Sequence, residues 1–421
     1  MLLGVIADDM TGATDVALML SRAGMRTLQV IGAPAPGAAL PEADAIVVAL
    51  KSRTNPAAEA VAESLAACEA LLAGGARQIL FKYCSTFDST PKGNIGPVAD
   101  ALVGRLGAKI AIVCPAFPAN GRSIYQGYLF VGAVPLHESP MKDHPLTPMR
   151  DSSLVRLMAA QTRAPVGLVD YANIRKGAEA VRARLDALAG EGVRYAVTDA
   201  LTNEDLLTLG AAVDGMPLLT GGSGIAMGLP ENFRRAGLLA PQSAGSAFSA
   251  PAGRAGILSG SCSTATRGQI AKAREAGYPA LKVDPLALSG GTQDAAALAD
   301  WALAQAPGTP FLLYSSDDPA EVAAVQDKLG REEAGAIVEH AFAEIARRLV
   351  AGGVSRLLVA GGETSGAVVQ GLKVETLEIG PEIDPGVPWT HALGGRDLVL
   401  ALKSGNFGAP DFFLKAWSLL A

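Results

Sequence analysis

Short apolar runs alternate along the chain with longer segments that carry apolar residues at helical spacing. In the first half, the runs predict buried strands at residues 2–7, 45–50, 78–82, 110–114 and 217–220. Ala-rich segments such as 15–23, 57–73 and 176–190 have the spacing of amphipathic helices. This alternation predicts a parallel sheet with helices on both faces.

The same alternation returns after residue 254, with strand-like runs at 254–259, 310–315, 355–360 and 398–402. Between the two series, residues 240–254 read APQSAGSAFSAPAGR, where small residues, Ser and Pro interrupt the helical pattern. We therefore expect an N-terminal domain at 1–240, a linker at 241–254 and a smaller C-terminal domain at 255–421. The predicted fold class is α/β, with two domains of mainly parallel sheets and the active-site cleft between them.

Two adjacent acids, Asp8 and Asp9, follow the first apolar run and precede a Gly/Thr-rich turn. Open α/β sheets bind ligands at the carboxyl ends of their strands, and two neighbouring acids cannot both face a core. At least one of them is thus expected to face solvent, a cation or a polar substrate. The alternative is that Asp9 or Thr11 caps the next helix, which would leave Asp8 without a function.

A second polar segment follows the predicted strand 78–82 and reads KYCSTFDSTPKGN from Lys82 to Asn94. Its hydroxyls and cations suit a polyhydroxylated carboxylate, and Arg53 could add a guanidinium from a third strand end. The alternative is an ordinary loop before a helix that begins near Asn94. Gly221 to Gly224, GGSG, forms another loop that could face a ligand. The candidate substrate-binding residues are Asp8, Asp9, Arg53, Lys82, Ser85, Thr86, Asp88, Ser89, Gly222 and Ser223.

Three strands of the second half end in glycine-containing loops, at 259–263, 360–366 and 403–408. Backbone N–H groups at a helix N-terminus bind phosphate readily, although glycine is also common in tight structural turns. None of these loops has the GxxxxGK[ST] spacing, and none has a GxGxxG fingerprint. The sequence therefore predicts phosphate binding without a Walker-type or dinucleotide motif.

Composition narrows the classes of partner. The 421 residues are 49% hydrophobic and 18% charged, with a formal net charge of -6 and no basic block, which argues against a nucleic-acid partner. No apolar run is long enough to span a bilayer, and Asp8 and Asp9 interrupt any apolar signal region. The four cysteines form no CxxC pair and the four histidines show no metal-ligand spacing. We expect a cytoplasmic protein with reduced thiols, no membrane partner and no structural metal.

A sugar acid in one domain and phosphates in the other predict phosphoryl transfer from a nucleotide to a substrate hydroxyl, with Mg²⁺ bridging the phosphates. Asp8 is the expected catalytic base, and Asp9 could share that function. Asp88 or Glu363 could instead help to hold the metal through water. The rivals are a binding protein without turnover and a nicotinamide-dependent dehydrogenase, but the dehydrogenase fingerprint is absent.

Five motifs resemble those of the four-carbon acid sugar kinases, namely IADDMTGATD, KYCSTFDSTPKGNIGP, CPAFPANGRSIYQG, TGGSGIA and VAGGETSGAV. The resemblance runs nearly end to end and implies an acid-sugar-binding domain, an ATP-binding domain and ATP-dependent phosphorylation of a four-carbon sugar acid. It implies substrate contacts at Asp8, Arg53 and the loop from Lys82 to Thr90. The ATP contacts that it implies are Ser259, Gly361, Gly362, Glu363, Thr364 and Gly405.

A Pro-rich segment at residues 131–152 contains HESPMKDHPLTPMRDS and has the composition of a lid, a binding loop or an interface arm. It could exchange between the subunits of a homodimer or fold over its own active site. This segment and the form FKYCSTFDSTPKGNIGPV are most similar to the branch of the family that acts on the 4-hydroxyl of 3-oxo-tetronate. Threonate and erythronate kinases are the alternative branches.

Overall fold

The computed structural model describes residues 1–144, 147–241, 248–395 and 397–420. The chain forms two compact units, residues 1–245 and 246–421, and each contains a mainly parallel set of strands. The predicted α/β class with mainly parallel sheets is confirmed. Domain limits at 240 and 255 stay a prediction, and residues 242–247 of the expected linker lie outside the described residues.

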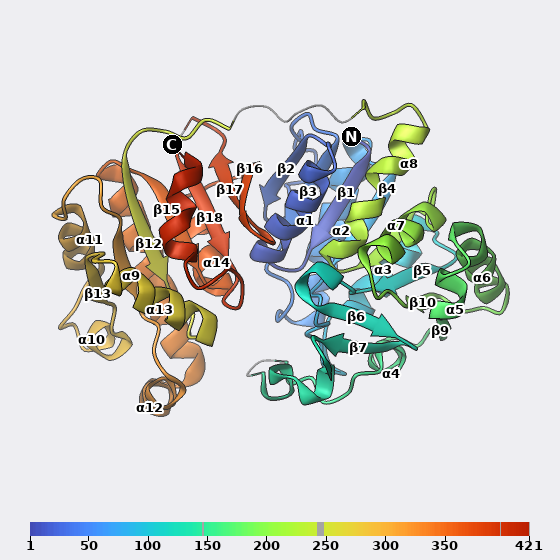
Figure 1. The fold of residues 1–421 in the computed structure, drawn as a ribbon, viewed down its shortest axis with the longest axis horizontal. Helices are drawn as coiled ribbons and strands as arrows, with labels where there is room; N and C mark the ends of the chain where they lie inside the picture. The colour runs from blue at the N-terminus through green and yellow to red at the C-terminus, as the bar shows by residue number, and fades with distance from the viewer. Residues whose placement is uncertain (145–146, 242–247, 396, 421) are drawn as a thin grey trace. The chain divides into compact units, whose positions relative to one another are not determined.

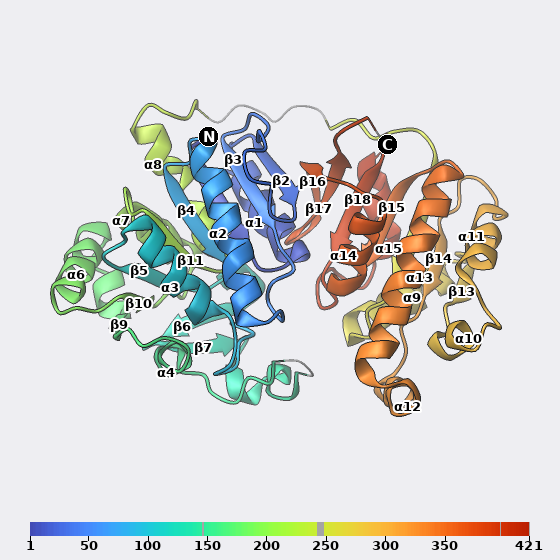
Figure 2. The same cartoon turned by 180° about the vertical axis from the view of Figure 1, so that it is seen from behind.

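Unit 1 is built on a parallel sheet with helices on both faces (Figures 1 and 2). Its strands, in spatial order, are β2 (Thr27–Ile31), β3 (Ala45–Ala49), β1 (Leu3–Ala7), β4 (Gln78–Lys82), β11 (Leu218–Gly221), β5 (Ala111–Cys114), β10 (Tyr195–Thr198) and β9 (Val166–Val169). The chain moves from β1 to β2 on one side and from β3 to β4 on the other. Because such crossovers are right-handed, the helices that follow β1 and β3 cover opposite faces.

The helices of unit 1 follow that rule, and contacts join α2 to α3 on one face and α1 to η4 on the other (Figures 1 and 2). Their bounds are α1 (Met10–Arg22), α2 (Ala57–Ala73), α3 (Ile95–Leu106), α4 (Leu154–Ala159), α5 (Tyr171–Ile174), α6 (Ala178–Gly190), α7 (Asn203–Ala212) and α8 (Pro230–Arg235), with 3-10 turns η1 (Pro118–Asn120) and η4 (Ser223–Gly228).

A small antiparallel sheet stands apart from the main sheet of unit 1 and consists of β6 (Arg122–Tyr125), β7 (Tyr128–Val131) and β8 (Val134–Pro135). Its hairpin tip is held by the buried carboxylate of Asp199, which accepts the N–H groups of Gln126 and Gly127 at 2.7 and 2.8 Å. The 3-10 turns η2 (Leu136–Glu138) and η3 (Pro140–Asp143) continue the chain. The segment 131–152 is thus largely irregular, as its composition predicts, and its residues 145–146 are outside the described part.

Unit 2 has a mixed sheet, parallel in its first five strands and closed by an antiparallel hairpin. In spatial order the strands are β13 (Ala280–Lys282), β14 (Phe311–Tyr314), β12 (Arg254–Ser259), β15 (Val354–Ala360), β18 (Val399–Lys403), β17 (Val387–Ala392) and β16 (Thr376–Asp384). Its helices are α9 (Thr264–Glu275), α10 (Pro285–Ser289), α11 (Ala295–Leu303), α12 (Pro319–Leu329), α13 (Arg331–Ala351), α14 (Gly362–Gly371) and α15 (Phe412–Lys415), followed by η5 (Ala416–Leu420).

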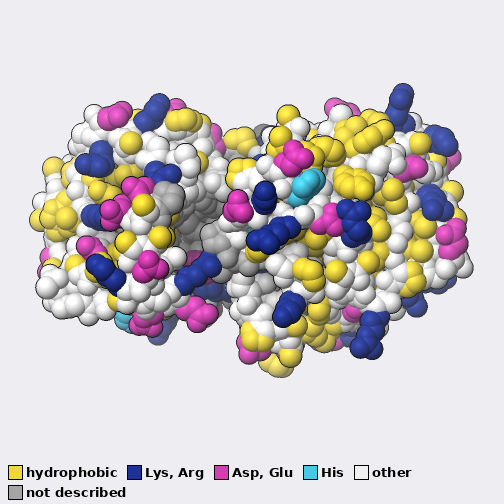
Figure 3. Space-filling view, turned by 90° about the horizontal axis from the view of Figure 1, so that it is seen from below, with side chains coloured by type: hydrophobic (Ala, Val, Ile, Leu, Met, Phe, Trp, Pro, Cys, Tyr) yellow, Lys and Arg dark blue, Asp and Glu magenta, His cyan; other side chains and the backbone are white. Residues whose placement is uncertain are grey.

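In the described part of the chain, no helix is both long enough and apolar enough to cross a membrane. On the face drawn in Figure 3, Lys and Arg side chains are interspersed with Asp and Glu side chains. That face therefore presents a mixed electrostatic surface.

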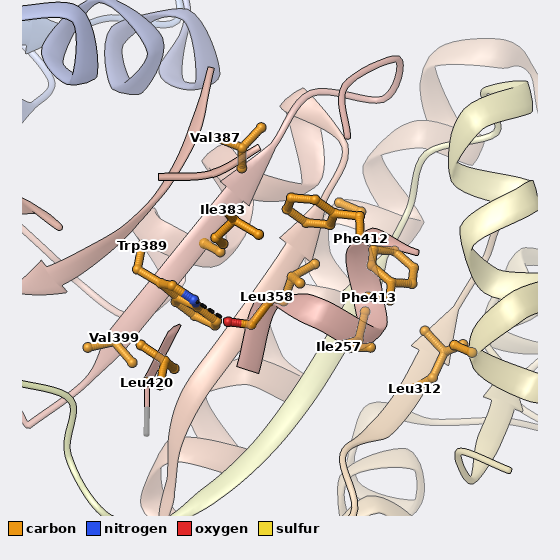
Figure 4. Close-up of a cluster of buried hydrophobic side chains, with 14 of the residues drawn as sticks. Ile257, Leu312, Leu358, Ile383, Val387, Trp389, Val399, Phe412, Phe413 and Leu420 are labelled. Atoms are coloured by element: carbon orange, nitrogen blue, oxygen red, sulfur yellow. Dashed lines mark hydrogen bonds between the residues drawn. The ribbon is translucent and has the colours of Figure 1, made fainter. Parts of the chain in front are cut away.

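The core of unit 2 gathers around Trp389, whose ring is fully buried and whose Nε1–H donates to the carbonyl of Ala416 at 2.9 Å (Figure 4). Phe412 and Phe413 contribute two further buried rings, which form an edge contact with centroids 6.2 Å apart. These aromatic side chains fix the face of β17 and β18 that carries α15.

Candidate active site

Polar residues gather where β1, β3 and β4 end, side by side in the sheet of unit 1. The backbone joins the three ends directly, because Asp8 donates its N–H to the carbonyl of Lys82 at 3.0 Å and accepts the N–H of Ser52 at 3.0 Å. The chain turns away from β1 in opposite directions on its two sides, which makes this edge a topological switch point. Ligands of open α/β sheets bind at such points.

Asp8 is almost fully buried and forms a two-pronged ion pair with Arg53. The guanidinium donates Nε–H to Oδ2 of Asp8 at 2.9 Å and Nη2–H to Oδ1 at 2.8 Å. A planar fork of this kind matches a carboxylate in both distance and direction. Arg53, which the sequence predicts to bind a sugar acid, therefore binds a carboxylate of the protein itself in this structure.

Asp9 has two functions in the same structure. Its Oδ1 accepts the N–H of Gly12 at 3.2 Å, so it is the N-cap of α1, and the helix-cap alternative is confirmed for this residue. The same oxygen accepts Nη2–H of Arg53 at 2.8 Å and lies 3.5 Å from Nζ of Lys82. Asp9 thus joins the helix to both cations of the cluster.

The two acids titrate in opposite directions. Burial raises the pKa of Asp8, an effect that Arg53 only partly offsets. Burial alone would also raise the pKa of Asp9, but the combined charges of Arg53 and Lys82, with hydrogen bonds from Thr11 and Gly12, hold it well below its usual range. Asp9 is therefore the fixed anion, and the raised pKa of Asp8 makes it the carboxylate of the two that accepts a proton more readily.

Lys82 is only 4% exposed, and its amine lies against the first turn of α1. A Cβ on residue 12 would collide with Nζ of Lys82 and with Oδ1 of Asp9. Only glycine leaves room there for the amine to approach. Gly12 is thus part of the cluster, although its sequence context suggested no more than a flexible turn.

The loop after β4 brings Asp88 to the same place. Its Oδ2 lies 3.8 Å from Nη1 of Arg53, and its Oδ1 accepts the hydroxyl of Thr86 at 2.7 Å. Phe87 and Asp88 both have positive φ, 66° and 44°, which a non-glycine residue adopts at a cost of about 1–3 kcal/mol. The buried ring of Phe87, in edge contact with Tyr83 at 5.6 Å, holds this strained turn.

Other candidates have partners outside the cluster. The Ser89 hydroxyl exchanges hydrogen bonds with the amide of Gln161, at 2.9 and 3.2 Å, whereas Ser85 is half-buried beside it. Ser223 donates to Oδ2 of Asp15 at 2.6 Å, and Gly222 is buried against the carbonyl of Pro115. The structure thus brings together Asp8, Asp9, Arg53, Lys82 and Asp88, and the role of every candidate residue stays a prediction.

The side chain of Asn94 supports the segment that carries Arg53. Its buried amide donates to the carbonyls of Ser52 and Asn55, both at 2.8 Å, and to that of Arg53 at 3.3 Å. The segment that carries Arg53 is therefore clamped to the start of α3. Sequence reasoning treated Asn94 only as a helix start, and a side chain that serves a loop 40 residues earlier leaves no local signal.

Loops of unit 2 converge in the same way, because β12, β15 and β18 are neighbours. The N–H groups of Gly260 and Ser261 donate to the carbonyl of Ala360 at 3.0 and 3.2 Å, and Gly361 donates to that of Lys403 at 2.8 Å. Gly361 has φ of 121°, which favours glycine, and precedes α14 directly. Its position leaves the N-terminus of α14 open as an anion site.

The predicted nucleotide residues line these loops. Thr364 lies buried with its hydroxyl against Gly260 and Gly361, Ser259 pairs its hydroxyl with that of Ser316 at 3.1 Å, and Gly405 lies against Ser261. Gly362 and Glu363 form the exposed first turn of α14. The N-terminus of α14 and these hydroxyls suit phosphate oxygens.

No cluster of three or more His, Cys, Asp or Glu side chains that could hold a metal ion occurs among the described residues. Magnesium needs few protein carboxylates when phosphates and water complete its shell. The donor set therefore fits an ion that enters with a nucleotide, and it does not fit a cage made by the protein alone.

Family comparisons cover both units. A family model described as the sugar-binding N-terminal domain matches residues 3–229, and one described as the nucleotide-binding C-terminal domain matches residues 257–413. The chain is similar to a 3-oxo-tetronate kinase of Cupriavidus necator, with 58% identity over 99% of this chain and 96% of the relative. A protein of the same description from Salmonella typhimurium is 46% identical over 98% of each chain.

A solved structure from Salmonella typhimurium has a TM-score of 0.87 and 46% sequence identity, over 98% of this chain and 98% of the other. That protein was described as a tRNA synthase. At that coverage the likeness extends over both units.

Proposed function

The chain belongs to the family of four-carbon acid sugar kinases, and from that premise we propose that it transfers the γ-phosphoryl group of ATP to the 4-hydroxyl of 3-oxo-tetronate. The products are 3-oxo-tetronate 4-phosphate and ADP. The observation that carries the proposal is 58% identity to a 3-oxo-tetronate kinase along nearly the whole of both chains. The ion-pair cluster of unit 1 and the phosphate-binding loops of unit 2 have the chemistry that this reaction needs.

In the proposed mechanism, Asp8 accepts the proton of the 4-hydroxyl. The hydroxyl oxygen forms a bond to the γ-phosphorus, and the bond from that phosphorus to the β-phosphate oxygen breaks, so that ADP leaves. The raised pKa of Asp8 makes it a stronger base than an ordinary aspartate. Asp9, held as an anion, is assigned the orientation of Arg53 and Lys82 rather than proton transfer.

Arg53 and Lys82 are assigned to the carboxylate of the sugar acid, since they are the two cations of the cluster. Thr86, Ser85 and Ser223 are assigned to its hydroxyl and keto oxygens. Mg²⁺ bound to the phosphates would neutralise their charge, with Asp88 or Glu363 assisting through water. The N–H groups in the first turn of α14, the N–H group of Gly405 and the hydroxyls of Ser259 and Thr364 would bind the phosphates.

Charge gives no support to a tRNA-dependent activity. The chain has 35 Lys and Arg against 41 Asp and Glu, and the face in Figure 3 mixes the two signs. Proteins that bind a polyanion of that size concentrate positive charge on one face.

The test is release of ADP from ATP and Mg²⁺ with a panel of 3-oxo-tetronate, D-threonate, L-threonate, D-erythronate and a blank without acid. We expect turnover with 3-oxo-tetronate well above every other member of the panel. A preference for threonate or erythronate would keep the kinase and overturn the acceptor. Absence of turnover with all four acids, together with binding of ATP, would favour a sensor.

A further inference from the structure

Lys403 is a charged side chain inside unit 2 that the proposed mechanism does not use. It is the last residue of β18 and is fully buried. Its Nζ donates to the hydroxyl of Thr266 at 2.9 Å and to the carbonyls of Ser404, Gly405 and Phe407 at 3.0, 3.0 and 3.1 Å. Within the described residues, no acidic side chain pairs with it.

The loop that Lys403 holds is also tied down from α9. Ser263 and Thr266 donate their hydroxyls to the carbonyl of Gly405 at 2.5 and 2.8 Å. Gln269, one turn further along α9, donates Nε2–H to the carbonyls of Phe407, Gly408 and Ala409 at 3.1, 2.9 and 3.1 Å. The carbonyls of this loop therefore point toward α9 and Lys403.

Peptide geometry sets the direction of the N–H groups in this loop. In a trans peptide, the carbonyl of one residue and the N–H of the next point in opposite directions. Because the carbonyls of Ser404 and Gly405 point inward at Lys403, the N–H groups of Gly405 and Asn406 point away from it. In the part of the chain that the structure describes, neither of these N–H groups has a protein acceptor.

These outward N–H groups lie beside the other phosphate-binding loops. A Cβ on residue 405 would be 2.5 Å from Oγ of Ser261, and β18 adjoins β15, which leads to Gly361. Consecutive outward N–H groups form a concave anion site of the kind that binds phosphate.

We propose that Lys403 is a positioning residue for the nucleotide: it holds the carbonyls of loop 404–408 inward, so that the N–H groups of Gly405 and Asn406 face the phosphates. The inference rests on the proposed function, because it assigns the phosphates of ATP to this loop. A buried lysine without an acidic partner is costly, and a methionine would fill similar space without that cost. The positioning role gives a reason for a lysine at this place, because its Nζ holds the carbonyls of the loop in one arrangement.

The experiment compares binding of ATP with Mg²⁺ by calorimetry in wild type, K403M and T266V. Thr266→Val keeps the shape of the side chain and removes one of the oxygens that Lys403 and Gly405 share. Lys272→Met, an exposed lysine on the same helix α9, is the matched control. The same variants are assayed for the KM of the sugar acid, and the melting temperature without ligand is measured.

For K403M we expect a Kd for ATP raised at least about tenfold, with the KM of the acid unchanged, because the hydrogen bonds from Nζ that hold loop 404–408 are lost. For T266V we expect a rise of roughly two- to tenfold. The K272M variant should bind ATP as the wild type does. A merely structural lysine would instead lower the melting temperature and leave the Kd for ATP of the folded protein unchanged, and that result overturns the inference.

Should K403M fail to fold, T266V decides the question: a weaker Kd supports the inference and an unchanged Kd overturns it. Failure of the wild type to bind ATP would overturn the proposed function itself, and this inference with it. Binding by the wild type that is matched by both variants would overturn only the role of Lys403.

Discussion

Asp8 combines burial, a nearby guanidinium and a raised pKa at one strand end. Replacement by Asn keeps the size of the side chain and removes its ability to accept the hydroxyl proton. We expect D8N to lower kcat by roughly 10²- to 10⁴-fold. Arg53 keeps its contact with Asp9 in this variant, so the fold should persist.

Steady-state kinetics and a melting curve check this expectation. Asp186→Asn, on the exposed side of α6, is the matched control and should leave kcat unchanged. A D8N enzyme with wild-type kcat would remove Asp8 from the role of base.

Lys403 makes stability depend on pH. Burial lowers the pKa of Lys403 to about 7, whereas an unfolded lysine keeps a pKa near 10.5. Between these values the unfolded chain binds a proton that the folded chain does not. The free energy of unfolding should therefore rise with pH from about 7 upward, by up to about 1.4 kcal/mol per pH unit from this group.

Urea unfolding of wild type and K403M at several pH values between 6 and 9 isolates that contribution, because other titrating groups are common to both. The stability of the wild type relative to K403M should be constant below pH 7 and increase above it. A difference that stays constant over the whole range would mean that Lys403 titrates normally.

At the scale of elements, the connection between α3 and the segment after β3 depends on the hydrogen bonds of one side chain, Asn94. Asn94→Ala removes the donor that serves the carbonyls of Ser52, Arg53 and Asn55. We expect the KM of the acid to rise about tenfold and the Kd for ATP to stay constant, since the released segment carries Arg53 and belongs to unit 1.

Asn173→Ala is the control, because it loses a comparable side-chain hydrogen bond, to Asp170, on α5. Kinetics with each substrate varied in turn separate the two effects. Equal KM values for the acid in N94A and wild type would show that the clamp does not position Arg53.

Nine of the 18 strands in the described residues could be predicted, because each of the nine is a short apolar run. β4 and β12 match the predicted bounds at both ends, and β3 and β15 match within one residue. The strand β16 was missed because Gly, Pro and acidic residues interrupt its half-buried sequence. The turn signal Asp384-Pro385-Gly386 between β16 and β17 was available and would have indicated a hairpin.

The site was predictable only in part. Strand ends that are neighbours in a parallel sheet must bring their polar residues together, which located Asp8, Arg53 and Lys82. Which carboxylate takes the guanidinium and which caps the helix depends on side-chain directions that spacing does not encode. The burial of Lys403 could not be predicted either, because a lysine after an apolar run is usually solvated.

For the whole molecule, the two units should respond to separate ligands. A sugar acid alone should slow hydrogen exchange in the loops after β1, β3 and β4. An ATP analogue alone should slow exchange at residues 259–264, 361–365 and 404–408, because a ligand that binds the folded state suppresses opening of the segments that it contacts.

Hydrogen exchange followed by mass spectrometry, with each ligand added singly, measures this directly. Protection by the acid confined to unit 2, or by the ATP analogue confined to unit 1, would reverse the assignment of the two ligands. Residues 57–73 of α2 serve as an internal reference whose exchange should change least.

Asp9 both caps α1 and binds the two cations of the site, so a substitution at residue 9 affects folding and substrate binding together. Its Oδ1 serves the first turn of α1, Arg53 and Lys82 at once. A substitution that keeps the cap, such as Ser or Asn, removes the anion that Arg53 and Lys82 share. One that keeps the charge on a longer side chain misplaces a cap worth about 1 kcal/mol. A lineage that adapts to a new acid would thus lose folding stability by altering residue 9. Acceptor preference should therefore evolve more readily at Ser85, whose hydroxyl has no hydrogen-bond partner among the residues that the structure describes.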